Sequence, residues 1–278
     1  MKETRAEYLA VDKLRPFDEH PFKVVDNEEM DQLTWSILTQ GLLTPLVVRP
    51  LPNGEYEVIS GHRRLHACKK AGIETVPALI TDMDRDAAAI ALVDSNLQRE
   101  HILPSEKAYA YKLKLEAMNH QGRTSGQVGQ KWTRDEIAEG ESGRQVQRYI
   151  RLTNLIPGIL QKVDEGRIAL TPAVELSYLT DAEQEDLLET MESEDCTPSL
   201  SQAIQMKALS QSGQLDMDTI FHIMTQPKAN QQEKISFKVS ELRDFFPRHY
   251  TAAQMMQEIK MALKERQQRL ARQRDHSR

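Results

Sequence analysis

The sequence predicts an α+β fold, in which a small mixed α/β domain precedes an all-helical region and a short C-terminal helical segment. Two observations predict it. Short β-branched runs alternate with helix signals up to residue 80, and beyond residue 90 apolar residues recur at spacings of three and four. Aromatic residues make up only 5% of the 278-residue chain, which favours helices over a large β-sandwich. We therefore expect three domains, spanning residues 1–100, 101–210 and 215–278.

The first domain is predicted to contain two helices and three strands. Asn27 suits the N-cap of a helix that carries Met30, Leu33 and Ile37 on one face and ends at Gly41. The elements predicted after it are strands at 45–49 and 56–60 with a turn at 52–54 between them, a helix over 62–71 that ends before Gly72, and a strand at 75–80.

Helical spacing continues in the second domain. Pro104 opens a predicted helix over residues 103–118, and the glycine-rich segment 119–130 is predicted to be a loop. Short helices are expected as far as residue 210, and the segment SQSGQLD, residues 210–216, is predicted to be a linker. An apolar stripe at helical spacing precedes residue 103 and comprises Ile90, Val93 and Leu97.

Composition excludes several classes of protein. The two cysteines, Cys68 and Cys196, form no CxxC pair, which argues against a structural zinc site or a disulfide framework. The N-terminal segment lacks the apolar core of a signal peptide, and no segment approaches the roughly 20 apolar residues of a membrane span. We therefore expect a cytoplasmic protein without membrane contact. The net charge of −6 does not indicate nucleic-acid binding, although clustered basic residues could still provide it.

The segment EVISGHRRLHAC predicts an anion site. A strand ends at Gly61, where the lack of a side chain lets the backbone approach a ligand closely. The helix behind it presents unpaired N–H groups and the positive end of its dipole. Arg63 and Arg64 add permanent charge and bidentate donors suited to phosphate, and Ser60 and His62 could add further donors.

Taken alone, the same segment also fits a solvated pair of surface arginines. It matches neither the GxxxxGK[ST] nor the GxGxxG phosphate-binding pattern. His62 and His66 lie four residues apart and could share a helix face as metal ligands. No third ligand is indicated nearby except Cys68, which should lie on the buried side, so exposed or helix-capping histidines are the simpler interpretation.

A second basic motif, WTRDEIAEGESGRQVQRYIRLTNLIP at residues 132–157, predicts a helix-turn-helix. Val146 and Ile150 would pack its second helix, whose basic stripe and glutamines would meet phosphates and base edges. The alternative is an ordinary helical hairpin, and the spacing from Ala138 to Val146 is about two residues shorter than usual. The residues expected to contact DNA are Thr133, Ser142, Gly143, Arg144, Gln145, Gln147, Arg148 and Arg151.

The last segment is predicted to be a basic helix. Met256, Ile259, Leu263 and Leu270 fit a heptad-like stripe that could pair with a second copy of the chain. Residues 260–278 hold seven bases and two acids, which suits either phosphate contact or a solvated tail.

Together these motifs resemble the ParB family of chromosome and plasmid partition proteins, particularly those of Gram-positive plasmids and integrative elements. The resemblance covers about residues 10–180 and is weak over 215–278. It implies a ParB-like N-terminal domain, a helix-turn-helix domain and a dimerising C-terminal segment. The segments that carry it, in the family's order, are PFDEHPFKV, GLLTPLVVRP, YEVISGHRRLHACKKAGIETVPALI, VDSNLQREHILPSEKA and GRQVQRYIRLTNL.

The resemblance implies that the first domain binds CTP with Mg²⁺. The GHRR segment would cradle the triphosphate, LLTPLVVR would line the nucleoside side, and SNLQR would lie over the phosphates and the metal. Asn96 is the implied metal-side residue. The implied nucleotide contacts are Thr44, Pro45, Arg49, Ser60, Gly61, His62, Arg63, Arg64, Asn96 and Arg99.

The resemblance also implies an action on DNA. The helix-turn-helix would read a parS-like site in double-stranded DNA, and CTP would close a homodimer into a clamp that slides along it. A ParA-type ATPase is the expected partner, and the protein would be cytoplasmic and associated with the nucleoid.

Two departures from the family bear on nucleotide hydrolysis. Family members commonly have Glu where His62 stands and a Glu-Asn pair where Ser95 and Asn96 stand. Serine is a poorer partner of Mg²⁺ or water than a carboxylate, so binding is better supported than hydrolysis of CTP to CDP and phosphate, which stays open. His62 could instead donate to phosphate, and its charge would then make binding pH-sensitive.

Two other functions stay open, and the departures favour the first of them. One is a plain site-specific transcription regulator with a weak or inactive nucleotide pocket. The other is an enzyme, because the ParB N-terminal fold is similar to that of sulfiredoxin, whose loop cysteine this chain lacks at SGHRR.

Overall fold

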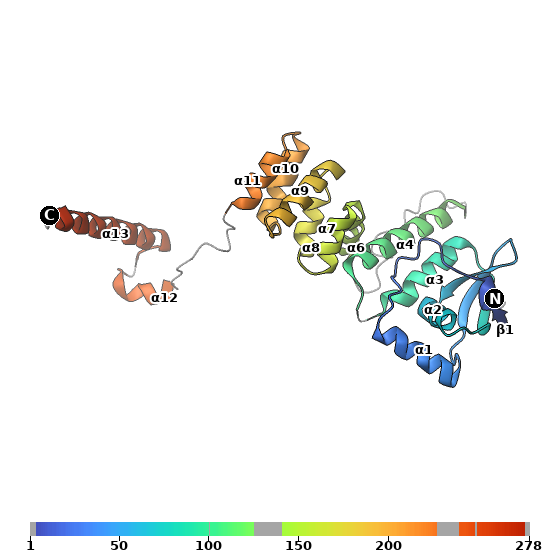
Figure 1. The fold of residues 1–278 in the computed structure, drawn as a ribbon. Helices are drawn as coiled ribbons and strands as arrows, with labels where there is room; N and C mark the ends of the chain where they lie inside the picture. Colours follow the sequence, from blue (N-terminus) through green and yellow to red (C-terminus); the bar gives the residue numbers. More distant parts are fainter. Residues whose placement is uncertain (1–3, 100, 125–140, 227–238, 248, 276–278) are drawn as a thin grey trace. The chain divides into compact units, whose positions relative to one another are not determined.

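The chain folds into two compact units, Met1–Gln226 and Pro227–Arg278. The computed structural model describes residues 4–99, 101–124, 141–226, 239–247 and 249–275. In the first unit, a sheet with helices on both sides leads into a series of short helices (Figure 1). The predicted α+β class is confirmed.

A five-stranded mixed sheet, in the order β1-β5-β3-β4-β2, forms the N-terminal half of the first unit. β5 pairs antiparallel with β1 and parallel with β3, whereas β4 pairs antiparallel with β3 and parallel with β2. The strands are β1 (Thr4–Ala10), β2 (Leu14–Pro16), β3 (Leu46–Pro50), β4 (Tyr56–Ser60) and β5 (Thr75–Thr81). The three predicted strands are therefore confirmed.

The edge strand β1 is additional to the prediction. Its one buried side chain is Leu9, while Tyr8 is 76% exposed, so the strand lacks the alternation of apolar and polar residues that would indicate it. The short strand β2 at the opposite edge has one buried side chain, Leu14, and is preceded by a 3-10 turn, η1 (Val11–Lys13).

Each face of the sheet packs against its own helices, because neighbouring side chains in a strand point to opposite faces. Val58 of β4 lies in one apolar cluster with residues of α1 and α2, and Ile59 lies in another with residues of α3 and α4. These helices are α1 (Glu28–Gln40), α2 (His62–Lys70), α3 (Arg85–Leu97) and α4 (Pro104–Thr124).

The helix boundaries in this half follow the predicted signals. The Asn27 side chain accepts a hydrogen bond from the Met30 N–H, and α1 ends at Gly41. α2 begins directly after Gly61, whose φ of 104° lies in the left-handed region. A Cβ at that position would lie 2.6 Å from Leu46 Cδ2, so the junction between β4 and α2 requires glycine.

An apolar core runs through most of the described helical half of the first unit. It joins Ala108 of α4 to the buried faces of the later helices, including Leu176 and Ile220. The elements are α6 (Gly143–Arg151), η2 (Leu152–Asn154), α7 (Pro157–Asp164), α8 (Leu170–Leu176), α9 (Asp181–Ser193), α10 (Leu200–Gln211) and α11 (Met217–Thr225).

Two predictions for this half are wrong. α4 continues to Thr124, so the loop predicted for 119–130 is helical over its first part, and its remainder lies outside the described residues. The predicted linker 210–216 is the turn between α10 and α11, and Ile223 of α11 is fully buried in the same core. The three domain ranges stay predictions, but the packing of α11 argues that the C-terminal segment begins after Gln226.

The second unit contains a predicted element, the long basic helix. The described elements of this unit are α12 (Val239–Leu242), η3 (Arg243–Phe245) and α13 (Ala252–Asp275), and α13 is the predicted basic helix. On α13, Met256 and Leu263 are 52% and 58% exposed. In the described part of the chain, no helix combines the length and apolar character that a membrane span requires.

Candidate functional site

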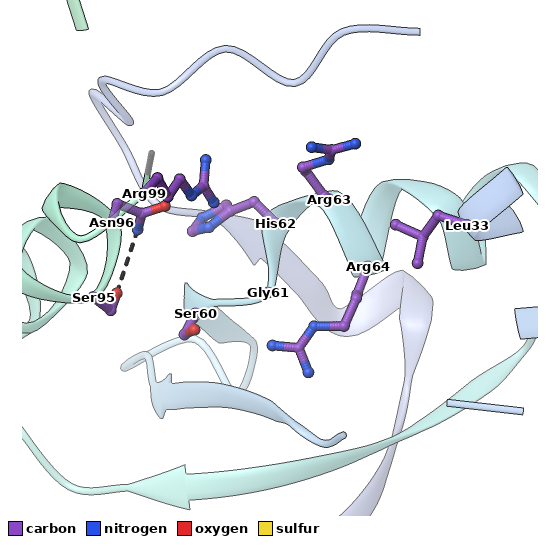
Figure 2. Close-up of a pocket in the computed structure, with 9 residues that line it drawn as sticks. All are labelled: Leu33, Ser60, Gly61, His62, Arg63, Arg64, Ser95, Asn96 and Arg99. Atoms are coloured by element: carbon purple, nitrogen blue, oxygen red, sulfur yellow. Dashed lines mark hydrogen bonds between the residues drawn. The ribbon is translucent and has the colours of Figure 1, made fainter. Parts of the chain in front are cut away.

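A polar cleft of about 240 Å³ opens where β4 ends and α2 begins. Three stretches distant in sequence meet there: α1, the β4–α2 junction, and the end of α3 (Figure 2). The lining residues are Leu33, Ser60, Gly61, His62, Arg63, Arg64, Ser95, Asn96 and Arg99. Seven of the ten predicted nucleotide contacts are thus brought together.

Positive charge dominates the lining. Arg63, Arg64 and Arg99 all contribute to it, and none of the described lining residues is a carboxylate. Burial, followed by repulsion from Arg63, lowers the pKa of Arg99. The two guanidinium groups therefore act on each other electrostatically, as expected of side chains arranged around an anion.

The two consecutive arginines have different contacts. Arg63 donates to a carboxylate oxygen of Glu29 at 3.1 Å, and both side chains are exposed. Such a surface pair exchanges readily for another anion. Arg64 points the other way in Figure 2 and donates to the backbone carbonyl oxygens of Thr44 and, at 2.9 Å, Pro45.

Burial lowers the pKa of Arg64, which matches its position under the β4–α2 junction. Because its guanidinium fixes the segment before β3, Thr44 and Pro45 are held beside the cleft without lining it. Arg64 therefore supports the shape of the cleft as well as its charge.

His62 is a buried imidazole rather than an available donor. Its Nε2 accepts a hydrogen bond from the Phe17 N–H at 3.2 Å, and its ring lies 3.8 Å from that of His20. Burial, followed by the proximity of His20 and Arg99, lowers the pKa of His62 to about 3. The ring is therefore neutral at ordinary pH, and phosphate binding by a charged His62 stays a prediction that its burial does not favour.

His20 is a residue that the sequence did not single out. Its Nδ1 lies 2.6 Å from the Phe22 carbonyl oxygen, and burial lowers its pKa. The motif PFDEHPF carries no spacing that links it to the β4–α2 junction, so only the fold brings the two histidines together. His66, the other histidine considered as a metal ligand, instead faces Asp26 at 3.1 Å.

The end of α3 contributes the polar groups opposite α2. Ser95 Oγ donates to the Leu92 carbonyl oxygen at 2.9 Å, and Asn96 Nδ2 donates to the same oxygen at 2.8 Å. Asn96 Nδ2 also lies 3.3 Å from Ser95 Oγ. The amide nitrogen of Asn96 is thereby engaged, so its Oδ1 is the atom that could accept from or ligate a guest.

The donor set does not fit a protein-held Mg²⁺ ion. Proteins usually bind Mg²⁺ through one or two carboxylates together with phosphate oxygens. Here an amide oxygen and serine hydroxyls are the neutral oxygen donors of the described lining. Asn96 as a metal ligand stays a prediction that this chemistry does not favour.

Arg49 is not brought to the cleft. Its Nε donates to Glu57 at 2.6 Å, across the β3–β4 pair, and both side chains are nearly buried. A second oxygen of Glu57 accepts from the Asp18 N–H at 3.4 Å. Glu57 therefore ties the sheet to the segment that carries His20, and Arg49 holds the other oxygen of the same carboxylate. The sequence could not distinguish Arg49 from the cleft arginines.

The second helix of the predicted helix-turn-helix is present as α6. The Ser142 side chain caps it by accepting from the Gln145 N–H, and Val146 is fully buried against Tyr111 and Met118 of α4. Thr133 and the predicted first helix lie outside the described residues.

The basic stripe on α6 is divided in its contacts. Arg144 is exposed in the first turn. Arg148 donates to Gln145 Oε1 at 3.2 Å and to Thr171 Oγ1 at 2.6 Å. Arg151 donates to Ser177 Oγ at 3.1 Å, so the stripe is progressively anchored to α8 along its length.

Tyr178 and Lys207 extend this basic surface, and the sequence did not indicate them. The Arg151 guanidinium lies 3.8 Å and the Lys207 ammonium 3.6 Å from the centre of the Tyr178 ring. Lys207 also pairs with Glu175 at 2.8 Å. Since cations are attracted to an aromatic face, the ring links α6 to α10 and fixes the end of the predicted recognition helix.

Comparisons with known proteins identify the family of the chain. Residues 1–97 match the ParB N-terminal domain. A probable chromosome-partitioning protein ParB of Vibrio cholerae is 30% identical over 238 residues, which is 84% of this chain and 77% of that protein. The chromosome-partitioning protein Spo0J of Thermus thermophilus is 36% identical over 181 residues, 65% of this chain and 61% of that protein.

Solved structures of the C-terminally truncated ParB of Caulobacter crescentus were also matched. The complex with the centromeric parS site is 23% identical with a TM-score of 0.43, covering 74% of this chain and 99% of that one. The complex with CTP-γ-S is 25% identical with a TM-score of 0.33, covering 68% of this chain and 99% of that one.

Proposed function

Because this chain belongs to the ParB family of partition proteins, we propose that it binds a specific parS-like DNA site and that CTP binds in its N-terminal cleft. The cleft carries this proposal. Arg63 and Arg99 converge where Gly61 lets the backbone of α2 approach a phosphate, and the N-terminus of α2 points its free N–H groups the same way.

CTP in the cleft would act as a switch for movement on DNA. The nucleotide would contact α1, α2 and the end of α3 at once, because all three line the cleft. α3 in turn packs against α4, and Val146 of α6 packs on α4. Closure around CTP would therefore be transmitted to the DNA-reading helix and would convert a site-bound dimer into a sliding clamp.

The DNA contacts would come from the start of α6. Ser142, Gly143, Arg144, Gln145 and Gln147 lie in its cap and first turns, where a recognition helix meets base edges. Arg148 and Arg151 are anchored to α8 and would act on phosphates from that position. Thr133, which lies outside the described residues, would add a further DNA contact.

The assembly would be a homodimer on the nucleoid, with a ParA-type ATPase as partner. The apolar stripe of α13, including the exposed Met256 and Leu263, supports pairing with a second copy. The basic charges on the same helix would add nonspecific phosphate contacts.

Genome-wide immunoprecipitation of the wild type and Arg63→Ala tests the proposal. We expect a broad peak around each site for the wild type and a narrow peak for the variant, since site binding survives while sliding is lost. Arg15→Gln, which removes an exposed arginine paired with Glu55, is the matched control and should keep the broad peak. Absence of a localised peak for the wild type would exclude a partition role, and narrow peaks for all three proteins would favour a plain transcription regulator.

A further inference from the structure

We infer that the cleft holds the phosphates of its nucleotide with arginines and backbone N–H groups, and that this binding does not require a divalent cation. The inference rests on the proposed nucleotide function and departs from the metal-dependent site that the family resemblance implies. The described residues that line the cleft supply positive charge and hydrogen-bond donors, and none of them is a carboxylate.

Two positions of the cleft that could carry a metal-binding acid carry none. The position beside Asn96 is Ser95, whose hydroxyl is turned to the Leu92 carbonyl oxygen of its own helix. The position after Gly61 is His62, whose Nε2 is already taken by the Phe17 N–H. Neither side chain supplies the carboxylate through which proteins commonly hold Mg²⁺ beside a phosphate.

Three described acids near the cleft have other partners. Asp94 pairs with the buried ammonium of Lys114 on α4, and so serves the contact between α3 and α4. Glu106 accepts from the backbone N–H groups of Lys23, at 2.8 Å, and Leu103, at 3.1 Å. Glu29 pairs with Arg63 at the rim. Each of these carboxylates has a different contact, and none lines the cleft.

The side chains of the cleft already supply the positive charge that a polyphosphate needs. A nucleoside triphosphate carries several negative charges, and Mg²⁺ commonly neutralises part of them. In this cleft the guanidinium groups of Arg63, Arg64 and Arg99 already supply positive charge. A free cation entering among them would be repelled, whereas a polyphosphate would relieve the repulsion between Arg63 and Arg99.

Calorimetric titration of the full chain with CTP, in magnesium buffer and in EDTA, tests the inference. We expect the dissociation constants in the two buffers to agree within about fivefold. A larger loss in EDTA overturns the inference and leaves the proposed nucleotide function intact. If CTP binds in neither buffer, the proposed nucleotide function fails and the inference falls with it.

Ser95→Glu and Ser95→Ala supply the matched comparison. The glutamate restores a carboxylate next to Asn96, so its CTP binding should become magnesium-dependent and weaken by more than about tenfold in EDTA. The alanine variant should remain as insensitive to EDTA as the wild type. Magnesium-dependent binding by the alanine variant would overturn the inference, and insensitivity to EDTA in both variants would contradict the assignment of cation independence to the missing carboxylate.

Discussion

The imidazole rings of His20 and His62 lie 3.8 Å apart with an interplanar angle of 41°. They come from segments separated by the whole of α1 and β3, and both have lowered pKa values because they are buried. His62 additionally accepts from the Phe17 N–H, so the pair fixes the chain before α1 onto the start of α2. Two neutral rings can pack at this distance, whereas two charged rings would repel each other.

Protonation of this pair predicts a loss of stability in mild acid. The pKa of His62 falls from its ordinary value near 6.5 to about 3 in the folded state, so the unfolded state binds the proton first as the pH falls. The stabilisation is fully present above pH 6.5 and is lost progressively below it. From pH 6.5 to pH 5 the free energy of unfolding should fall by about 1.5 kcal/mol from this residue alone.

Urea unfolding of the wild type, His62→Gln and His66→Gln across that pH range checks this prediction. The glutamine at 62 cannot titrate, so the dependence on pH should be shallower whatever the variant's absolute stability. His66→Gln, which removes an exposed histidine beside Asp26, is the control for the loss of a histidine as such. Parallel slopes for all three proteins would contradict the assigned protonation.

Removal of Glu29 should strengthen nucleotide binding. Its carboxylate holds Arg63 at 3.1 Å and competes with a phosphate for the same guanidinium. An exposed ion pair contributes about 0.2–1 kcal/mol, so Glu29→Gln should tighten binding of CTP about two- to threefold at low salt. The gain should vanish at high salt, because screening already weakens the pair.

Glu28→Gln is the control for this effect. Glu28 is exposed and neighbours Glu29 at the start of α1, so the variant changes the net charge equally while leaving the Arg63 pair in place. A similar gain in both variants would indicate a general charge effect, and would contradict competition at Arg63.

The fold was largely predictable because its local signals are strong. Asn27, Gly41 and the β-branched strands gave correct boundaries, since caps and alternation act within a few residues. β1 was missed because an edge strand with one buried residue has no alternation to detect. The extension of α4 to Thr124 was missed because its end, NHQGRT, contains residues of low helix propensity and no apolar residue at helical spacing.

The cleft was only partly predictable for a related reason. Gly61 and the arginines behind it were indicated by their local order, and they do line the cleft. Arg49 contacts Glu57, Arg63 contacts Glu29, and Arg64 contacts the backbone at Thr44. The sequence does not show that these partners lie beside the arginines, so it could not distinguish the three roles. The neutrality of His62 depends on burial under His20 in the same way.

Gly61→Ala should damage both folding and the cleft. A Cβ there would meet Leu46 Cδ2 at 2.6 Å, and the φ of 104° is strained for any residue with a side chain. We expect a loss of about 2–4 kcal/mol in unfolding free energy, from strain and from displacement of the fully buried Leu46. Gly54→Ala shares the positive φ but meets nothing within 4 Å, so it should lose only about 1–2 kcal/mol. Equal losses in denaturant titrations would contradict the steric argument.

Arg144→Ala should weaken DNA binding more than a substitution of Arg151 that still allows the protein to fold. Arg144 is exposed in the first turn of α6, whereas Arg151 is held by Ser177 and Tyr178. If Arg144 contacts a base, its loss should weaken binding by about 1–3 kcal/mol and relax the preference at one base pair. If it contacts a phosphate, binding should weaken equally on all sequences and the salt slope should fall by about one.

Arg167→Ala removes an exposed arginine paired with Asp195 in the same helical region and should leave affinity unchanged in gel-shift titrations. Wild-type affinity and salt dependence in Arg144→Ala would show that α6 does not approach DNA through its first turn.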